Sequence, residues 1–163
     1  QVNETFDRQV DMLFRPAHQM AEKGLCDGWM ADPQGCVALC LALCHIPRHI
    51  YRQTPKAYAT DKQAVYVAKH AVFKKYDALV PVEQRYFLYS PFMYSEERSD
   101  QRRSVELFST LKDKEPIHYK NACERLQTIE EFGRFPERNA TLGRISSREE
   151  SFYLDKKSFS AFA

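Results

Sequence analysis

Residues 33–52 read PQGCVALCLALCHIPRHIYR and indicate the most deeply buried helix of the chain. Asp32 can cap the first turn, and Pro33 suits a first helical position because its missing N–H needs no partner there. Pro47 is expected to end this helix, because proline removes a backbone donor. Few polar residues interrupt the apolar run between these limits, as is typical of a buried helix. The apolar residues include Val37, Leu39, Leu41 and Leu43.

Helical spacing of apolar residues continues on the amino-terminal side of this segment. Gly24 is suited to stop a first helix there, because glycine readily adopts the left-handed conformation that follows a helix end. Pro16 lies inside the stretch and is expected to kink or divide it. The stripe that defines this helix consists of Phe6, Val10, Leu13, Ala17 and Met20.

On the carboxyl-terminal side, capping residues and prolines predict further helices. Thr60 with Gln63 resembles a capping box, in which each side chain bonds to the backbone of the other. Ser146 with Glu149 resembles another, for a short last helix. The helices between them are expected to begin at Pro81, Ser99-Asp100 and Pro116, the last of them closed by Gly133.

A succession of helices joined by short loops predicts an all-α domain built from antiparallel helix pairs. The chain has 163 residues, which suits a single domain. A chain of that size buries roughly 70% of its unfolded surface, enough for a core of its own. We assign residues 1–154 to this domain and residues 155–163 to a carboxyl-terminal tail.

The composition excludes several classes of protein. Hydrophobic residues make up 44% of the chain and charged residues 28%, which is ordinary for a globular protein and unlike a disordered one. No apolar stretch reaches the roughly 18 residues that a membrane-spanning helix needs. The net charge of +2 is too small to indicate a nucleic acid. We therefore expect no nucleic-acid partner and no membrane span.

The cysteines favour an intracellular, reducing compartment such as the cytoplasm or an organelle matrix. The chain has five, an odd number, and their spacing matches neither a metal-binding knuckle nor a small secreted disulfide framework. Asn-X-Thr triplets at Asn3 and Asn139 are weak evidence for secretion, because such triplets often arise by chance. The sequence starts at Gln1 rather than at methionine, so loss of a targeting segment stays open.

Three segments combine prolines, arginines and aromatic residues at short spacing. In chain order they are IPRHIYR (46–52) with AYATD (57–61), PFMYSE (91–96) with DQRRSV (100–105), and FGRFPERN (132–139) with LGR (142–144). Together they resemble the family named domain of unknown function 924, over nearly the whole chain from about Phe6 to Leu154. The resemblance implies a helical superhelix similar to tetratricopeptide-repeat proteins. It implies no activity, because none is assigned to that family.

The chain departs from the family's usual pattern where that pattern has an acid and two histidines. The family usually reads Asp-Gln-Phe-Pro-Arg-Asn before Ile-Tyr-Arg, whereas this chain reads Cys-His-Ile-Pro-Arg-His at residues 44–49. Tyr94 replaces the histidine of His-Ser-Glu, and Glu137 replaces the histidine of Phe-Pro-His-Arg-Asn. If the family has a proton-transfer site there, this chain is expected to be a repurposed, non-catalytic relative.

Arginines within the three segments are candidate anion ligands, because a guanidinium offers a planar fork of donors to carboxylate or phosphate. If the segments converge, the arginines would form a pocket with neighbouring polar side chains. The alternative is that they pair with Glu96, Asp100 and helix-end carbonyls and so fix the loops. The candidate ligand-binding residues are Arg48, Tyr51, Arg52, Ser95, Glu96, Arg134, Arg138, Asn139 and Arg144.

No metal or cofactor site is predicted. Cys36, Cys40 and Cys44 lie four residues apart on one helical stripe, with His45 and His49 just beyond, and such a stripe could share a soft metal. We favour the interpretation that small thiols fill a crowded helix interface. The chain has no glycine-rich phosphate loop, nucleophile elbow or His-Glu-X-X-His motif.

These observations favour an interaction or scaffold protein, such as an accessory subunit of a larger assembly, with a protein partner and no catalytic role. A binder of a small anionic ligand that uses the arginines is the alternative. An enzyme, perhaps a hydrolase that pairs Glu96 with His118 or His70, is the weakest hypothesis, because no nucleophile–base pair is recognisable.

Overall fold

The chain folds into helices, as the apolar spacing predicts. A computed structural model describes residues 3–160, and that part contains α-helices, short 3-10 or π turns, and no strand. This confirms the all-α class. The α-helices are α1 (Glu4–Glu22), α2 (Pro33–Cys40), α3 (Ile46–Ile50), α4 (Asp61–Phe73), α5 (Val82–Tyr94), α6 (Arg98–Ser109), α7 (Pro116–Phe132) and α8 (Arg148–Ser160). The short turns are η1 (Asp27–Ala31), η2 (Leu41–His45), η3 (Pro55–Tyr58), η4 (Tyr76–Leu79) and η5 (Pro136–Arg138).

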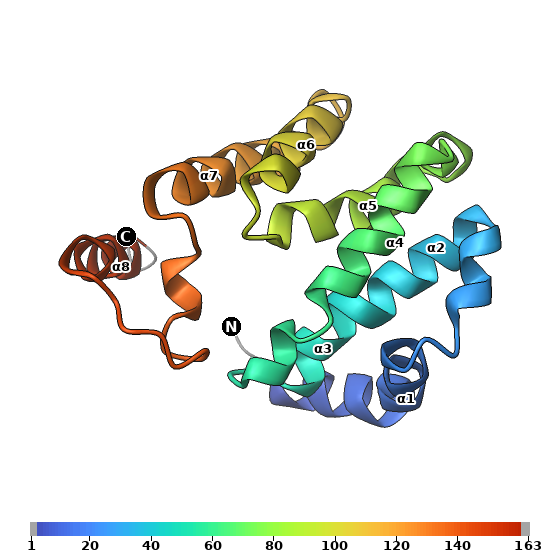
Figure 1. Ribbon diagram of the computed structural model, residues 1–163, viewed down its shortest axis with the longest axis horizontal. Helices are drawn as coiled ribbons and strands as arrows, with labels where there is room; N and C mark the ends of the chain where they lie inside the picture. The colour runs from blue at the N-terminus through green and yellow to red at the C-terminus, as the bar shows by residue number, and fades with distance from the viewer. Residues whose placement is uncertain (1–2, 161–163) are drawn as a thin grey trace.

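The helices stack on one another along a curved path (Figure 1). α1 packs on α3 and α2 packs on α4, after which α4 packs on α5, α5 on α6 and α6 on α7. α8 stands at the far end of the path and contacts mainly η5. It continues to Ser160, past the predicted domain boundary at residue 154, while residues 161–163 of the predicted tail lie outside the described residues.

The core lies where α2 and α4 meet α5 and α6. Leu39, Leu88 and Phe108 are fully buried there, and the rings of Tyr89 and Phe108 meet edge to face at 5.6 Å. Alanines on α4 allow close packing against α2, because a methyl side chain leaves little between two backbones; they are Ala64, Ala68 and Ala71.

The cysteine stripe is part of this core. Cys36, Cys40 and Cys44 are fully buried and free of disulfides. Burial raises the pKa of all three thiols, to about 11 for Cys36 and about 12 for Cys44. No group of three or more possible metal ligands gathers within residues 3–160. The thiols therefore act as small apolar side chains that fill the interface of α2 with its neighbours.

Residues 33–50 form one continuous helical path, so the prediction that Pro47 ends the helix is wrong. α2 passes directly into the π turn η2, in which the backbone N–H of Ile46 donates to the carbonyl of Leu41. α3 follows at once and has Pro47 in its first turn. A proline is tolerated in a first turn because its missing N–H would have no helical partner there. The path therefore carries Arg48 beyond the proline.

Two predicted caps are displaced. Ser147 and Glu150, rather than Ser146 and Glu149, form the capping box of α8: each backbone N–H donates to the side chain of the other. α4 begins beside Thr60 as predicted, but that hydroxyl donates to the carbonyl of Leu43 instead of capping the helix. Thr60 is buried against η2, whose Leu43 carbonyl gives the hydroxyl an acceptor outside its own helix.

The start of α6 differs from its prediction, whereas the ends of α1 and α7 agree with theirs. α6 begins at Arg98, so Asp100 lies inside its first turn and pairs with Lys69 at 2.6 Å rather than capping the helix. Gly24 and Gly133 have φ angles of 75° and 70° and close α1 and α7 as predicted. α1 runs undivided through Pro16.

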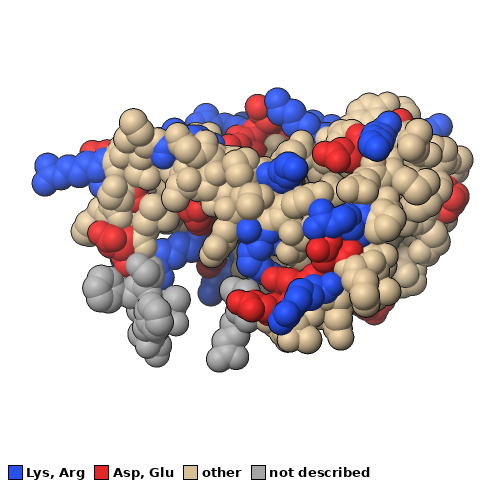
Figure 2. All heavy atoms as spheres, turned by 90° about the horizontal axis from the view of Figure 1, so that it is seen from below, with Lys and Arg blue, Asp and Glu red and all other residues tan. Residues whose placement is uncertain are grey.

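The described residues include no helix that is long and apolar enough to cross a membrane. On the face seen in Figure 2, cationic and anionic side chains are interleaved, and neither sign forms a continuous patch. That face therefore lacks the single-sign field that attracts a polyanion.

Candidate functional site

The first and third sequence segments meet at Asp61, the first residue of α4. Arg48 donates two nitrogens to the two carboxylate oxygens of Asp61, at 2.8 and 2.9 Å. Arg138 approaches the same carboxylate at 3.5 Å and donates to the backbone carbonyl of Tyr94 at 2.9 Å. One carboxylate therefore serves two arginines, and the second segment joins them through Tyr94.

Both arginines belong to a closed circuit of cation–π contacts, which we name the arginine–aromatic cluster. Each of its guanidinium carbons lies over two of its three rings, at 4.5 to 5.5 Å from the ring centroids. Such contacts are attractive because the face of an aromatic ring is electrically negative. The members of the cluster are Arg48, Tyr58, Tyr94, Arg125, Phe135 and Arg138.

Arg125 is the member that the sequence analysis missed. Its guanidinium lies between the rings of Tyr94 and Phe135, at 4.9 and 5.0 Å. Among residues 3–160, no carboxylate forms an ion pair with it. One signal was available: Arg125 is three residues after Ala122 and four before Ile129, so a cation stands on the buried side of its helix.

Within ion-pair distance the cluster has three guanidiniums and one carboxylate, that of Asp61, and therefore an excess of positive charge; Glu96 and Glu137 act on it only from farther away. The pKa of Arg138 reflects this excess. Burial lowers it, Arg48 and Arg125 lower it further, and Asp61 and Glu96 act in the opposite direction. A bound anion would lower the electrostatic energy of all three arginines.

A second network holds the loop between α7 and α8. Arg144 donates to both carboxylate oxygens of Glu96, at 2.8 and 3.0 Å, and the backbone N–H of Phe135 donates to the same group at 2.8 Å. Arg134 pairs with Glu150 of α8 at 2.6 and 2.8 Å. Arg134 and Arg144 thus fix loops through internal carboxylates.

The other predicted residues point away from the cluster. Arg52 pairs with Asp7 of α1 at 2.6 Å, and Ser95 donates to Asp100 at 2.8 Å. Tyr51 accepts a hydrogen bond from Arg15, and Asn139 donates to Ser146. The structure therefore gathers Arg48 and Arg138, sets Glu96 and Arg144 beside them, and places Tyr51 and Arg52 against α1.

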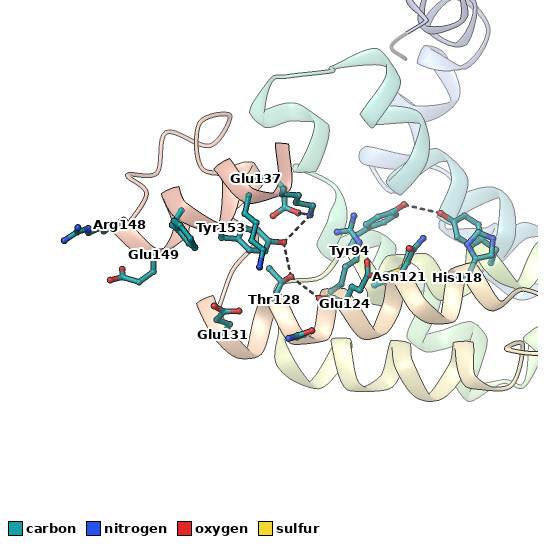
Figure 3. Close-up of a pocket in the computed structure, with 17 residues that line it drawn as sticks. Tyr94, His118, Asn121, Glu124, Thr128, Glu131, Glu137, Arg148, Glu149 and Tyr153 are labelled. Atoms are coloured by element: carbon teal, nitrogen blue, oxygen red, sulfur yellow. Dashed lines mark hydrogen bonds and ion pairs between the residues drawn. The ribbon is translucent and has the colours of Figure 1, made fainter. Parts of the chain in front are cut away.

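A cavity of ≈ 1210 Å³ opens beside the cluster, between α7, α8 and the end of α5 (Figure 3). Tyr94, Arg125 and Glu137 all line it. Two of the positions at which the chain departs from the family pattern, Tyr94 and Glu137, therefore lie in one cavity wall. Cys44, at a third such position, lies behind that wall, with its sulfur 3.6 Å from a guanidinium nitrogen of Arg48.

Three groups around this site each keep one protonation state at neutral pH. Burial raises the pKa of Cys44 to about 12, so the thiol stays protonated. Burial opposes the ionisation of Glu137, but its ion pair with Lys157 holds the pKa below the usual value. Burial, together with the charges of Arg48 and His49, lowers the pKa of His45 to about 4, so that ring stays neutral. None of the three is poised for proton transfer.

The histidines considered as partners of Glu96 have other contacts. The ring of His70 lies 3.0 Å from the carbonyl of Met30. His118 lies in the cavity wall, 3.7 Å from Glu115 and stacked on Tyr86. The Glu96 carboxylate accepts hydrogen bonds from Arg144 and from the backbone of Phe135, and among the described residues no histidine bonds to it.

His45 should make the stability of the fold depend on pH in the mildly acidic range. Burial lowers its pKa from 6.5 to about 4. Between pH 6.5 and 4, His45 binds a proton in the unfolded chain but stays neutral in the folded chain. The free energy of unfolding therefore falls as the pH falls through this range. We expect His45→Gln to flatten this dependence. Thermal unfolding of both chains across that range checks it, and equal slopes would contradict it.

Comparison with known proteins gives a family and a structural relative. The family model described as "Bacterial protein of unknown function (DUF924)" matches residues 1–158. Among solved structures, the protein of unknown function ATU0120 from Agrobacterium tumefaciens is 34% identical and has a TM-score of 0.91, over 96% of this chain and 87% of that chain. No curated protein matches. The chain therefore belongs to the family of bacterial proteins of unknown function DUF924.

Proposed function

We propose that this chain is a non-catalytic binding protein and that Arg125 receives an anionic group of its ligand in the cavity between α5, α7 and α8. One observation carries the proposal: two rings position the Arg125 guanidinium at the cavity wall, while no carboxylate among the described residues forms an ion pair with it. A guanidinium that is already ordered loses little conformational freedom when it binds. Its planar fork suits carboxylate and phosphate.

Arg48 and Arg138 support this role without contacting the ligand. Both point their nitrogens at Asp61, which leaves their combined charge only partly compensated. An anion on Arg125 would therefore be attracted by the whole cluster.

The size of the cavity favours a partner protein over a small metabolite. Pockets for small molecules usually enclose about 300–1,000 Å³, and this cavity encloses ≈ 1210 Å³. The stacked helices also support a superhelical, tetratricopeptide-like interaction protein, in which the anion belongs to a protein partner. An accessory-subunit role is a further prediction, which the native mass of the complex at its source would test.

Inorganic phosphate is the simplest probe of Arg125. We expect phosphate to shift the Nε–Hε nuclear magnetic resonance signal of Arg125 until it saturates. Arg125→Gln should weaken phosphate binding about tenfold or more, because one charge-assisted hydrogen bond contributes about 1.5–3 kcal/mol. Arg125→Lys should bind with intermediate affinity, since it keeps the charge but loses the fork.

Arg148 provides the matched control. It lines the same cavity from α8, is exposed, and lies outside the cluster. Arg148→Gln removes the same charge and should leave the phosphate affinity within about twofold, because exposed charges are screened. Equal phosphate binding by the parent chain and by a folded Arg125→Gln variant would overturn the proposed function.

A further inference from the structure

The cavity has the shape of a groove along α7. Residues of this helix follow one another along its wall, from His118 at one end to Glu131 at the other; Glu137 lies across the cavity, and the Tyr153 hydroxyl of α8 lies 3.3 Å from that of Thr128 on α7 (Figure 3). Thirteen residues of helix separate the two ends, which corresponds to about 20 Å. An extended peptide covers that distance with about six residues.

A second, apolar cavity continues the groove at its His118 end. It encloses ≈ 340 Å³, and its wall includes Val82, Phe87 and Leu111. The stacked rings of Tyr86 and His118 line both cavities, with their centroids 4.4 Å apart. A ligand that follows α7 therefore meets a cationic position at Arg125 and an apolar recess beyond His118.

The polar groups between these two positions suit a peptide backbone. Asn121 lines the wall between His118 and Arg125, and its amide makes no hydrogen bond within residues 3–160. A side-chain amide can donate to a peptide carbonyl and accept from a peptide N–H at the same time. Extended peptides expose such unpaired groups along their whole length.

The charges around the groove are mixed in sign. Glu124, Glu131, Glu137 and Glu149 line the same cavity as Arg125, and so do Arg148, Lys156 and Lys157. Arg125 differs from the other three cations because two aromatic rings hold its guanidinium in place. A lining of alternating sign offers no continuous cationic track to a chain of phosphates and fits one acidic group at Arg125.

We propose that the groove binds an extended peptide segment of a partner protein, with an apolar side chain in the ≈ 340 Å³ cavity and an acidic side chain on Arg125, four residues apart. This inference rests on the proposed function of Arg125. The apolar cavity spans from His118 to Glu115, which lie seven and ten helical residues from Arg125, or about 10–15 Å. Four residues of extended chain cover about 13 Å, and side chains four apart point the same way.

A series of synthetic peptides tests the spacing. Each is a capped octapeptide of serine with one leucine and one glutamate, separated by one to five positions in either order. Fluorescence polarisation with the full chain measures the affinity. We expect a separation of four to bind at least about tenfold more tightly than three, because a separation of three turns one of the two side chains away from the groove. Affinity that does not depend on the separation would overturn the inference.

Protein variants test the two contacts separately. Replacing glutamate by glutamine in the best peptide should weaken binding to the parent chain about tenfold, but should not change binding to Arg125→Gln. Val82→Phe fills the apolar cavity and should remove the advantage of leucine over alanine in the peptide, whereas Leu79→Phe, at an exposed position outside it, should retain that advantage. If the glutamate and glutamine peptides lose the same amount of affinity between the parent chain and Arg125→Gln, the assigned contact is contradicted.

The phosphate experiment separates the two proposals. If phosphate binds through Arg125 but every peptide binds weakly, the peptide inference fails and the anion site stands. If N-acetylglutamate alone binds as tightly as the best octapeptide, the ligand is a small acid and the inference also fails. If phosphate binding does not depend on Arg125, both proposals fail together.

Discussion

Asp61→Asn should lower the free energy of unfolding by about 3–5 kcal/mol, because it removes the one carboxylate that Arg48 and Arg138 share. The side chains of these arginines are only 20% and 10% exposed, and that of Asp61 is 14% exposed. Water therefore cannot readily replace the lost partner. Urea unfolding of the two chains at neutral pH measures the difference.

Two further variants show whether the effect comes from the unpaired charges. Asp113→Asn removes an exposed carboxylate and should change the stability by less than about 0.5 kcal/mol. Arg138→Gln combined with Asp61→Asn should cost less than the sum of the two single losses, because the double variant leaves fewer buried charges unpaired. Simple additivity would contradict the shared role of Asp61.

Phe108→Ala should cost about 3–5 kcal/mol of unfolding free energy, as large-to-small changes of buried aromatic residues do. Phe108 is fully buried on α6, and its ring meets the rings of Tyr86, Tyr89 and His118 at 5.6 to 6.1 Å. The truncation would leave a void between α5, α6 and α7, which the surrounding helices can fill only in part. Denaturant unfolding gives the loss directly.

Phe73→Ala is the matched control. Phe73 ends α4 and is 81% exposed, so its truncation removes little buried area and should change the stability by less than about 0.5 kcal/mol. Similar losses for the two phenylalanines would mean that the packing around Phe108 is not tight. The same Phe108 variant should weaken binding of the leucine peptides, because Phe108 supports the Tyr86–His118 pair that lines the apolar cavity.

The helices could be predicted because the burial of one face leaves a regular apolar pattern in the sequence. The exact residues at which the helices begin and end could not be predicted in the same way. The apolar run after Pro33 predicts a buried helix wherever the neighbours lie. Whether Pro47 ends this helix depends on the π turn before it, and no sequence pattern predicts that turn. The capping box at Ser147 and Glu150 lies one residue from its predicted place, since both serines before α8 have a glutamate three residues on.

The candidate site, too, could be predicted only in part from the sequence. Proline and arginine motifs predicted that three segments matter, and their meeting at Asp61 depends on how α3, α4 and η5 are oriented. Arg125 lies outside all three segments, and it joins the cluster only because α7 turns that face toward Tyr94 and Phe135. The rotation of a helix about its own axis is set by packing with several distant elements, which the sequence of that helix does not contain.

The carboxylate of Asp61 pairs with two arginines that the ribosome adds to the chain at different times. Asp61 and Arg138 are 77 residues apart, so at a translation rate of about 5–20 residues per second Asp61 waits roughly 4–15 s for its second arginine. During that interval the chain contains Arg48, Tyr58 and Asp61 but not yet the residues that close the circuit. A nascent chain that stalls before residue 138 therefore presents an unfinished polar cluster to chaperones and proteases, and synthesis of Phe135 and Arg138 completes it.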